Sequence, residues 1–576
     1  MRICYLYSMR IIVILFIWLL GCKPSSNQNT VAPKQETVDY FSNRNHGVIG
    51  DSAMVVSAHP EASKVGMAIL QQSGNAVDAA IAVQFALAVV YPNAGNIGGG
   101  GFMVTRMKDG SSNALDFREK APSTASRDMF INPANGEVNR KLIETSHLAS
   151  GVPGSVAGMW EAHQKYGSMD WKKLLQPAIE LAQKGFPITA HQAEDFNQLQ
   201  AELKQLNKGK NYFIKSKWNA NDTLIQTDLA TTLIAIRDNG RDGFYTGPVA
   251  EKIAAEMQQH NGIITTDDLK NYQAVWREPI KGTYKNYTII SMPPPSSGGI
   301  ALMQLLNMME NYPLKKWGFH SVNSVSIMTE AEKRVYADRA TWLGDPDFTK
   351  VPKNELISKS YSASRMQNVD TNTVTPAAQI KAGTFTGYES EETTHFSIVD
   401  KYGNAVSITT TLNDSYGSRI IVNGCGFILN NEMDDFSAKP GEPNLYGLIG
   451  GEANAIAPGK RMLSSMTPTI VEKDGQLFMV VGTPGGSTII TSVFQNIINV
   501  IEFDMTMQEA VDAPRFHNQW LPDEIKIEND FNETTVAALK AKGYKITDRE
   551  AIGRVDAILV YPNGKLEGAA DKRGDD

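Results

Sequence analysis

Two strand-like runs joined by a four-residue turn occupy residues 393–412. The run Thr393–Asp400 alternates apolar and polar residues, as a half-buried strand does. Lys401–Asn404 has the composition of a turn, and Ala405–Leu412 is again rich in β-forming residues. A hairpin centred on this turn pairs positions whose numbers sum to about 805, which makes Thr411 and Asn413 cross-strand neighbours of Thr393. The pattern defines this register to about one residue, and a slip of one would exchange the two faces.

The chain before this hairpin is mainly helical in pattern. Residues 155–345 have amphipathic periodicity, whereas residues 349–391 are polar, rich in Thr and Gly, and typical of a long exposed connection. From Thr393 the pattern changes to strands. The expected helices are Ser155–Tyr166, Trp171–Lys184, Leu229–Arg237, Val249–Gln258, Ile300–Met309 and Val322–Leu343, with two more in Val65–Val90 separated at Gly74-Asn75.

Composition describes a large globular core with a mildly acidic surface. The 576 residues are 42% hydrophobic and 20% charged, with a net charge of −7. A charge of this sign and size gives no reason to expect nucleic acid or an anionic membrane surface as a partner.

The first 21 residues have the pattern of a signal peptide. Arg2 and Arg10 precede the uncharged run Ile11–Leu20, which is too short to span a bilayer. The run ends in Leu19-Leu20-Gly21-Cys22, which resembles a bacterial lipobox, so we expect a lipid on Cys22; an ordinary signal peptide or an uncleaved anchor is the alternative. Residues 22–45 are a flexible tether by composition. The body is therefore expected to be exported, periplasmic and held to a membrane only by that lipid.

Two local motifs suggest ligands that their context does not support. Gly98–Gly101 lacks the Lys-Ser/Thr of a phosphate loop and the spacing of a dinucleotide fold, so a close backbone approach beneath an active site is favoured. The acidic segment Asn430–Phe436 lacks the ligand spacing of a calcium loop. No metal site is expected.

Thr393 is a candidate nucleophile that needs a base. A threonine hydroxyl is weakly nucleophilic, and no internal Ser/Thr–His–Asp signature is apparent. Cleavage between Glu392 and Thr393 would supply a base, because the new α-amino group titrates near pH 8 and lies beside the hydroxyl. The alternative is that Thr393 only begins a strand, where threonine is common.

Several motifs in a fixed order resemble the γ-glutamyltranspeptidase family of N-terminal-nucleophile hydrolases. The resemblance begins near residue 45 and extends to the C-terminus. The matching segments are Gly74–Ala80, Gly98–Phe102, Asp116–Pro122, Glu392–Ser397, Leu429–Gly441, Ser464–Thr469, Gly482–Ser487 and Ala513–His517.

The family implies an α+β fold, a four-layer αββα sandwich with two stacked antiparallel sheets between helices. Cleavage before Thr393 would divide the body into a large subunit, residues 46–392, and a small subunit, residues 393–576. The two would form a heterodimer around one shared core.

The resemblance also implies catalytic roles at matching positions. Thr393 would be the nucleophile and new N-terminus, and Thr411 would hydrogen-bond to it. Gly485 and Gly486 would donate main-chain N–H groups to the oxyanion of the tetrahedral intermediate.

A second set of matching positions would bind the amino-acid head of the substrate. Arg118, Ser464 and Ser465 would hold the α-carboxylate, for which a guanidinium fork is suited. Asn413, Glu432 and Asp435 would receive the α-ammonium group. Some family members have glutamine at the position of Glu432, so its charge is a point of variation.

The segment Pro440–Gly451 matches a lid present in some family members, with Tyr446 as its gate. His59, His395 and His517 also lie in matching motifs, but we expect structural roles for them because the amine already supplies a base.

The implied reaction is ping-pong acyl transfer without a cofactor. Glutathione or another γ-glutamyl compound would acylate Thr393, and water, an amino acid or a peptide would then accept the γ-glutamyl group. A related acylase for β-lactam side chains or a poly-γ-glutamate transpeptidase is the alternative within the superfamily. A non-catalytic binding lipoprotein is the alternative outside it.

Overall fold

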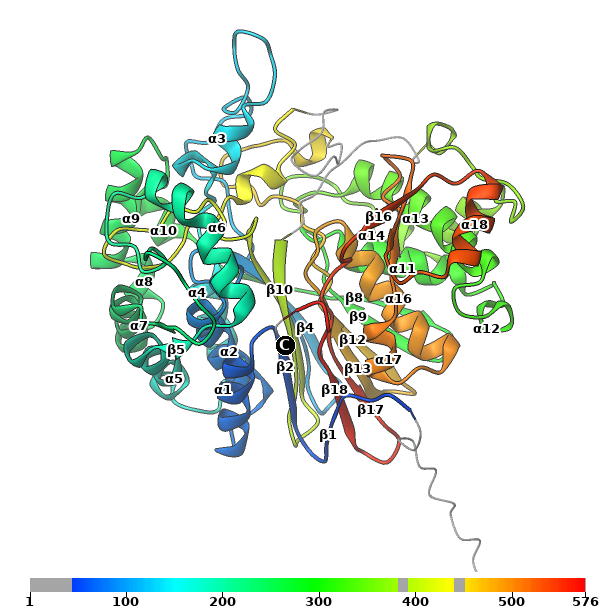
Figure 1. Cartoon of the computed structure of the whole chain (residues 1–576), viewed down its shortest axis with the longest axis horizontal. Coiled ribbons are helices and arrows are strands. Elements are labelled where there is room, and N and C mark those ends of the chain that lie inside the picture. The colour runs from blue at the N-terminus through cyan, green and yellow to red at the C-terminus, as the bar shows by residue number, and fades with distance from the viewer. Residues whose placement is uncertain (1–43, 382–391, 440–450, 575–576) are drawn as a thin grey trace, which may run out of the picture. The chain divides into compact units, whose positions relative to one another are not determined.

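The computed structural model describes residues 44–381, 392–439 and 451–574. Within these ranges, two large antiparallel sheets stack on each other, and strands β10 and β11 of one pack against β13 and β17 of the other. Helices cover both outer faces (Figure 1). This is the expected four-layer αββα arrangement.

The six-stranded sheet contains the predicted hairpin. Its strands are, in spatial order, β2 (Met54–Ser57), β10 (Glu392–Val399), β11 (Ala405–Asn413), β3 (Gly100–Arg106), β4 (Ser112–Asp116) and β7 (Val275–Arg277). The seven-stranded sheet has the order β1 (Val48–Gly50), β18 (Leu566–Ala569), β17 (Asp556–Val560), β13 (Gln476–Gly482), β12 (Thr469–Lys473), β9 (Tyr287–Ser291) and β8 (Ile280–Tyr284). Two small sheets are β14 (Phe516–His517) with β15 (Ile525–Glu528) and β16 (Ile546–Arg549), and β5 (Phe186–Pro187) with β6 (Thr223–Leu224).

Strand alternation distributes side chains between two hydrophobic cores. In β2, Val55 belongs to the core beneath one helical layer, whereas Met54 and Val56 belong to the core between the sheets and beneath the other layer. In β10, Phe396 and Ile398 face the first core, while His395 contacts Gly482 of the opposite sheet. The inner face of β10 therefore carries the polar side chains of His395 and Ser397, whereas Val399 belongs to the core between the sheets.

The first helical layer packs on the six-stranded sheet (Figure 1). It contains α1 (Pro60–Gln71), α2 (Ala76–Val90), α4 (Ser155–Tyr166), α5 (Trp171–Lys184), α6 (Ala190–Leu206), α7 (Thr227–Asn239), α8 (Asp242–Tyr245), α9 (Gly247–Gln259) and α10 (Thr266–Asn271), with α3 (Arg140–Glu144) and the 3₁₀ helix η1 (His147–Ala149) beside it. Asn75 and Asp78 form a capping box at the start of α2, because each side chain accepts a hydrogen bond from the main chain of the other.

The second helical layer packs on the seven-stranded sheet (Figure 1). It contains α11 (Gly298–Met309), α12 (Leu314–Trp317), α13 (Val322–Trp342), α14 (Lys353–Leu356), α15 (Lys359–Met366), α16 (Thr488–Phe503), α17 (Met507–Asp512) and α18 (Glu533–Lys542). Three further 3₁₀ helices are η2 (Ala377–Gln379), η3 (Glu432–Asp435) and η4 (Glu452–Asn454).

Two sequence-based expectations need correction. Residues 349–391 are not a structureless connection in their described part, because α14 and α15 form there. Strands β8 and β9 interrupt the predicted helical half, and α16–α18 interrupt the predicted strand half. Tertiary packing, which local periodicity does not record, decides both. The hairpin pairs positions whose numbers sum to about 804 along most of its length, as in Phe396 with Ile408, which is within one residue of the expected register.

Candidate active site

Thr393 lies opposite an irregularity in strand β11. Glu392 pairs with Asn413 and Thr394 pairs with Thr410, so the register shifts by one residue and Thr393 alone faces two residues of β11. A β-bulge of this kind redirects a side chain and is common beside active sites. The predicted nucleophile therefore occupies the one position in the described hairpin where the regular ladder is broken.

The end of β11 supports this position. The main-chain N–H of Asn413 donates to Thr411 Oγ1 at 2.8 Å, and Asn413 Nδ2 donates to the carbonyl of Asn431 at 3.0 Å. Asn413 has a φ of +79°, a conformation that asparagine tolerates better than most residues. This bend joins the hairpin to the loop that precedes η3.

A narrow cavity brings together eight of the ten predicted catalytic and head-group residues. Its volume is about 10 Å³, which is room for about one water molecule. A substrate larger than water enters only if side chains around it move. The lining residues are Arg118, Thr393, Thr411, Asn413, Glu432, Asp435, Ser464, Ser465, Met466 and Ile489.

Gly485 and Gly486 lie next to this cavity without lining it. They connect β13 to α16, and the N–H of Ile489, which lines the cavity, donates to the carbonyl of Gly486 at 3.1 Å. Gly485 has a φ of +128°, and a Cβ there would lie 2.5 Å from Thr488 Oγ1. The oxyanion role of the two glycines stays a prediction.

Arg118 is the centre of a buried charge cluster. Its side chain is 1% exposed and forms ion pairs with Glu432 and Asp435, with Glu119 at 3.6 Å. It also donates to the main-chain carbonyls of Met462 and Leu463, at 3.4 and 3.3 Å. The guanidinium predicted to bind a substrate carboxylate is thus held by the carboxylates predicted to bind the substrate ammonium.

Burial controls the protonation of these acids. It raises the pKa of Glu119 to about 7, although Arg118 opposes this effect. It also raises the pKa of Glu432 well above its usual range and that of Asp434 to about 8. Glu119, Glu432 and Asp435 surround the single guanidinium of Arg118, so neutral forms of some of these acids reduce their mutual repulsion.

The predicted carboxylate-binding serines are held by a neighbouring loop. Ser297 donates to the carbonyl of Ser464 through both its N–H and its hydroxyl, at 2.6 and 2.7 Å. Arg339 of α13 donates to Ser297 Oγ at 2.9 Å. The hydroxyl of Ser465 is buried and has no hydrogen-bond partner among the described residues, so it is available to a ligand.

The glycine run Gly98–Gly101 approaches the neighbouring backbone closely, as predicted from the sequence. A Cβ on Gly99 would lie 2.0 Å from the carbonyl oxygen of Thr411, and one on Gly100 would lie 2.5 Å from that of Phe117. Larger residues would separate β3 from the two segments that carry Thr411 and Arg118.

The histidines of the matching motifs have structural surroundings. Burial lowers the pKa of both His395 and His517 to about 3, so both are neutral near pH 7. His395 bonds to Thr409 and Ser397, and His59 caps helix α1 by accepting from the N–H of Glu61.

Sequence reasoning missed two residues near this site. It assigned no role to Glu119, although this residue follows Arg118 directly. It also missed Tyr336 of α13, whose hydroxyl donates to the carbonyl of Ser487, immediately after the two predicted oxyanion glycines. No sequence signal connects Tyr336 with Ser487, because 151 positions separate them. Cys22, Tyr446 and the side chain of Glu392 lie outside the described residues.

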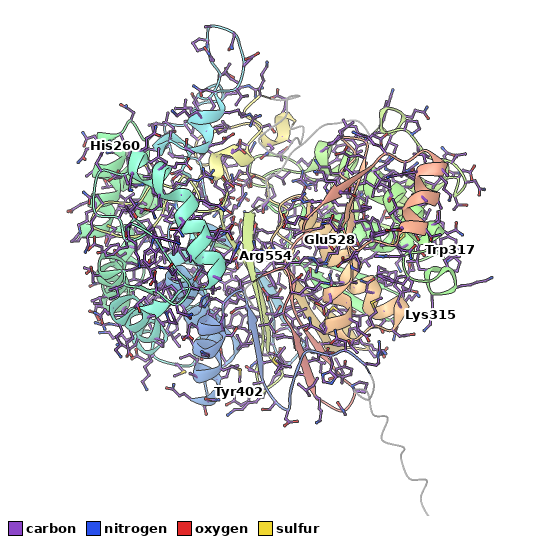
Figure 2. The ribbon with its side chains drawn as sticks, viewed as in Figure 1. His260, Lys315, Trp317, Tyr402, Glu528 and Arg554 are labelled. Carbon is purple, nitrogen blue, oxygen red and sulfur yellow. The ribbon has the colours of Figure 1, made fainter. Side chains whose placement is uncertain are left out.

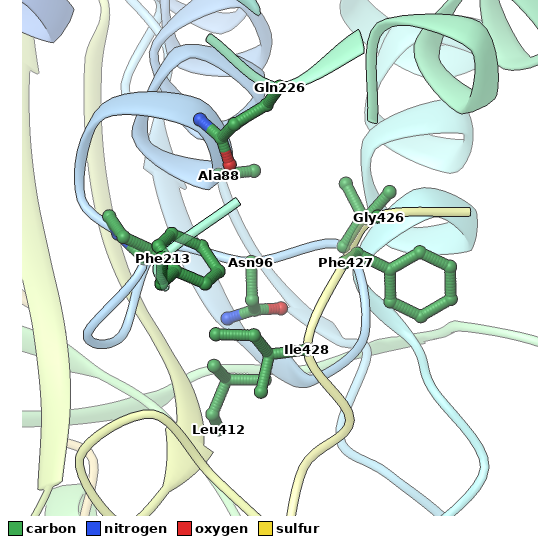
Figure 3. A pocket seen from close by; sticks show the side chains of 11 residues that line it. Ala88, Asn96, Phe213, Gln226, Leu412, Gly426, Phe427 and Ile428 are labelled. Carbon is green, nitrogen blue, oxygen red and sulfur yellow. The ribbon is translucent and has the colours of Figure 1, made fainter. Parts of the chain in front are cut away.

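A second small cavity lies between α2 and the loop that follows β11 (Figure 3). Its volume is also about 10 Å³, and its walls are mainly apolar, with Phe213, Leu412, Phe427 and Ile428 among them. Asn96 points toward it in Figure 3, but its amide already bonds to Thr410 and Thr411. Unlike the cavity lined by Thr393, this one has no titratable side chain among its lining residues, so it is a poor candidate for an active site.

Among the described helices, none has both the length and the apolar character needed to cross a membrane.

Comparisons with known proteins agree on one family. The family model for gamma-glutamyltranspeptidase matches residues 62–576. A glutathione hydrolase proenzyme of Escherichia coli (strain K12) is 50% identical over 534 residues, which cover 92% of each chain.

Two solved structures extend the comparison. The cephalosporin acylase from Bacillus halodurans aligns with a TM-score of 0.82 and 26% identity, covering 95% of this chain and 98% of its own. The gamma-glutamyltranspeptidase of Helicobacter pylori aligns with a TM-score of 0.56 and 45% identity; the alignment covers 97% of that chain but 59% of this one.

Proposed function

The chain belongs to the γ-glutamyltranspeptidase family, and we propose how its residues perform the reaction of a γ-glutamyltransferase and glutathione hydrolase. The activity follows from its relatives, which are named glutathione hydrolase proenzymes. One observation carries the assignment of residues: Thr393 lines the same cavity as a buried cation and two buried carboxylates. Such a cavity offers opposite charges to the α-carboxylate and α-ammonium groups of a γ-glutamyl head.

Self-cleavage is the first step of the proposal. Thr393 Oγ attacks the carbonyl carbon of Glu392, the peptide C–N bond breaks, and the amine of Thr393 is released as an ester forms. Water then hydrolyses the ester to a Glu392 carboxylate and a free Thr393 hydroxyl. The β-bulge opposite Thr393 and the proenzyme names of the relatives support this step. The Helicobacter pylori chain, which aligns with 59% of this chain, fits a two-subunit form.

Acyl transfer uses the new amine as the base. It accepts the proton of Thr393 Oγ as the oxygen attacks the γ-carbonyl carbon of glutathione. The amide C–N bond breaks, the departing amine takes that proton, and a γ-glutamyl ester remains on Thr393. Water or the amine of an amino acid or peptide then attacks the ester. No cofactor is needed for this balance of atoms.

The two kinds of proposed head-group contact are linked in this site. Arg118 would exchange its bonds to Glu432 and Asp435 for the substrate carboxylate, while these carboxylates turn to the substrate ammonium. Ser465 would add its unpaired hydroxyl to the same carboxylate. Because each new contact replaces an internal one, a zwitterionic head keeps all the buried charges paired.

Two variants test the nucleophile directly. On a denaturing gel, purified wild-type protein is expected to separate into two chains, and Thr393→Ala is expected to stay uncut and inactive with a chromogenic γ-glutamyl amide. Thr394→Val is the matched control, because the buried Thr394 hydroxyl has no hydrogen-bond partner among the described residues. A Thr393→Ala chain that still divides would contradict the assignment.

Acylase activity is a second candidate because of the similarity to the cephalosporin acylase structure. The buried acids Glu432 and Asp435 argue for a substrate with an ammonium group. Paired kinetics with a γ-glutamyl amide and the corresponding glutaryl amide, which lacks that group, separate the two activities. Faster turnover of the glutaryl amide would favour the acylase.

Export and lipid attachment complete the proposal. The lipobox-like ending at Cys22 supports a periplasmic enzyme anchored by lipid. The match of Pro440–Gly451 to the family's lid supports Tyr446 as the gate. Metabolic labelling with an alkyne-tagged fatty acid is expected to mark the wild-type precursor and not Cys22→Ser. Equal labelling of the two would remove Cys22 as the attachment site.

A further inference from the structure

Three potential metal ligands meet on the first helical layer, and none of them lines the cavity that contains Thr393. His147 belongs to η1, whereas Glu256 lies in the last turn of α9 and His260 caps its C-terminus. Their ligand atoms all lie within 4.8 Å of one another, and they form the one such group of three among the described residues. Figure 2 shows His260 at the outer edge of this layer.

The spacing of the donor atoms suits a small metal ion. Glu256 Oε1 lies 3.0 Å from His147 Nε2 and 3.6 Å from His260 Nε2. Metal–ligand bonds of about 2.0–2.1 Å at tetrahedral angles place donor atoms about 3.3 Å apart. The two distances to Glu256 Oε1 lie on either side of that value, and all three ligand atoms lie within 4.8 Å of one another, so side-chain rotations can bring them to it.

Local structure already orients the three side chains. Glu256 and His260 are four residues apart and therefore lie on one side of the helix end. The imidazole rings of His147 and His260 stack, with centroids 4.7 Å apart and planes inclined by 17°. The second carboxylate oxygen of Glu256 accepts a hydrogen bond from the N–H of Asn423 at 3.4 Å, which restrains its rotation. A plain ion pair would need only one of the two imidazoles.

We propose that His147, Glu256 and His260 bind a divalent transition-metal ion, with Zn²⁺ as the representative. Two imidazoles and one carboxylate, without thiolate, are ligands of this class, whereas Ca²⁺ and Mg²⁺ prefer oxygen ligands. The side chains of His147 and Glu256 are 8% and 11% exposed, and that of His260 is 38% exposed. Water can therefore fill a fourth position on the open side.

Metal binding would replace the contact between His147 Nε2 and Glu256 Oε1 with a bond from each atom to the ion. The ion would join η1 to α9. The segment that follows η1 contacts the loop before η3, because Ser150 Oγ donates to the carbonyl of Asn430 at 2.7 Å. We therefore expect metal binding to stabilise the fold.

Calorimetric titration of metal-free protein with ZnCl₂ tests the site. Wild-type protein and uncut Thr393→Ala are both expected to bind one equivalent of Zn²⁺. Because the uncut variant has no new N-terminal amine, its binding would exclude that amine as the ligand. His260→Ala and Glu256→Gln are expected to weaken binding at least about tenfold, because each removes one of three ligands. His260 is partly exposed, so its replacement should preserve folding.

His191→Ala is the matched control. His191 and Asp195 form another i,i+4 pair, 4.0 Å apart, and no third metal ligand joins them among the described residues. This variant is expected to bind Zn²⁺ as the wild type does. Thermal unfolding gives a second readout: Zn²⁺ should raise the midpoint of the wild type by about 2 °C or more and leave His260→Ala unchanged. Absence of wild-type binding, or equal binding by His260→Ala, would overturn the proposal.

Discussion

Arg118 and Glu432 form an ion pair in the cavity that Thr393 lines, although 314 positions separate them in the chain. The proposed cleavage site lies between them, so after processing this contact would join the two subunits. The same guanidinium also pairs with Asp435. The proposed substrate site and the junction between the subunits therefore share one buried charge cluster.

Replacing Arg118 by lysine should weaken donor binding. An ammonium group is a point charge and cannot reproduce the two-pronged contact of a guanidinium with carboxylates. A loss of about 2–3 kcal/mol, typical of a hydrogen bond to a charged group, corresponds to a decrease in kcat/KM of about 30- to 150-fold, mainly through KM. Steady-state kinetics with a γ-glutamyl amide measures it. Arg237→Lys, on the exposed face of α7, should stay within about twofold of the wild type.

Glu119→Gln should change how stability depends on pH. Because the pKa of Glu119 is raised in the folded protein to about 7, its protonated form stabilises the fold fully below pH 4.5, and this contribution is lost as pH rises to about 7. Glutamine does not titrate, so the variant should gain stability relative to the wild type over that interval. Thermal midpoints between pH 4 and pH 8, measured in the uncut Thr393→Ala chain, report the difference. Exposed Glu137→Gln is the matched control, and a constant difference across the interval would contradict the assignment.

Tyr336→Phe should lower kcat with little effect on the donor KM. The lost hydrogen bond holds the carbonyl of Ser487, directly after the proposed oxyanion donors Gly485 and Gly486. A neutral hydrogen bond contributes about 0.5–1.5 kcal/mol, so a decrease of about 2- to 10-fold is expected. Tyr402→Phe, at an exposed turn at the other end of the molecule (Figure 2), is the control. An equal change in KM would indicate a general structural defect instead.

Gly485→Ala should be more damaging than a glycine replacement elsewhere. Alanine is strained at a φ of +128°, and its Cβ would also collide with Thr488 Oγ1. Gly564 has a φ of +82° with open space around it, so Gly564→Ala should cost about 1–2 kcal/mol from backbone strain alone. Thermal unfolding and kcat compare the two variants. Equal losses would show that the neighbours of Gly485 do not matter.

Much of the fold could be predicted from local sequence. The helices Ser155–Tyr166 and Trp171–Lys184 have the expected bounds, and the hairpin forms where alternation and turn residues placed it. The motifs that resemble the family, taken in their order along the chain, then indicated the four-layer sandwich and the activity. These features depend on neighbours within a few residues, or on a resemblance carried by the sequence itself.

Only the tertiary structure decided how the site is assembled. The register shift at Thr393, the pairing of Arg118 with Glu432 and Asp435, and the bond from Tyr336 to Ser487 join segments distant in the chain. Strands β8 and β9 likewise form because the seven-stranded sheet provides partners for them. Hydrogen bonding and desolvation act on whatever atoms folding brings together. Thr393 could thus be predicted from sequence as a nucleophile, whereas the bulge opposite it and the charges around it depend on the assembled fold.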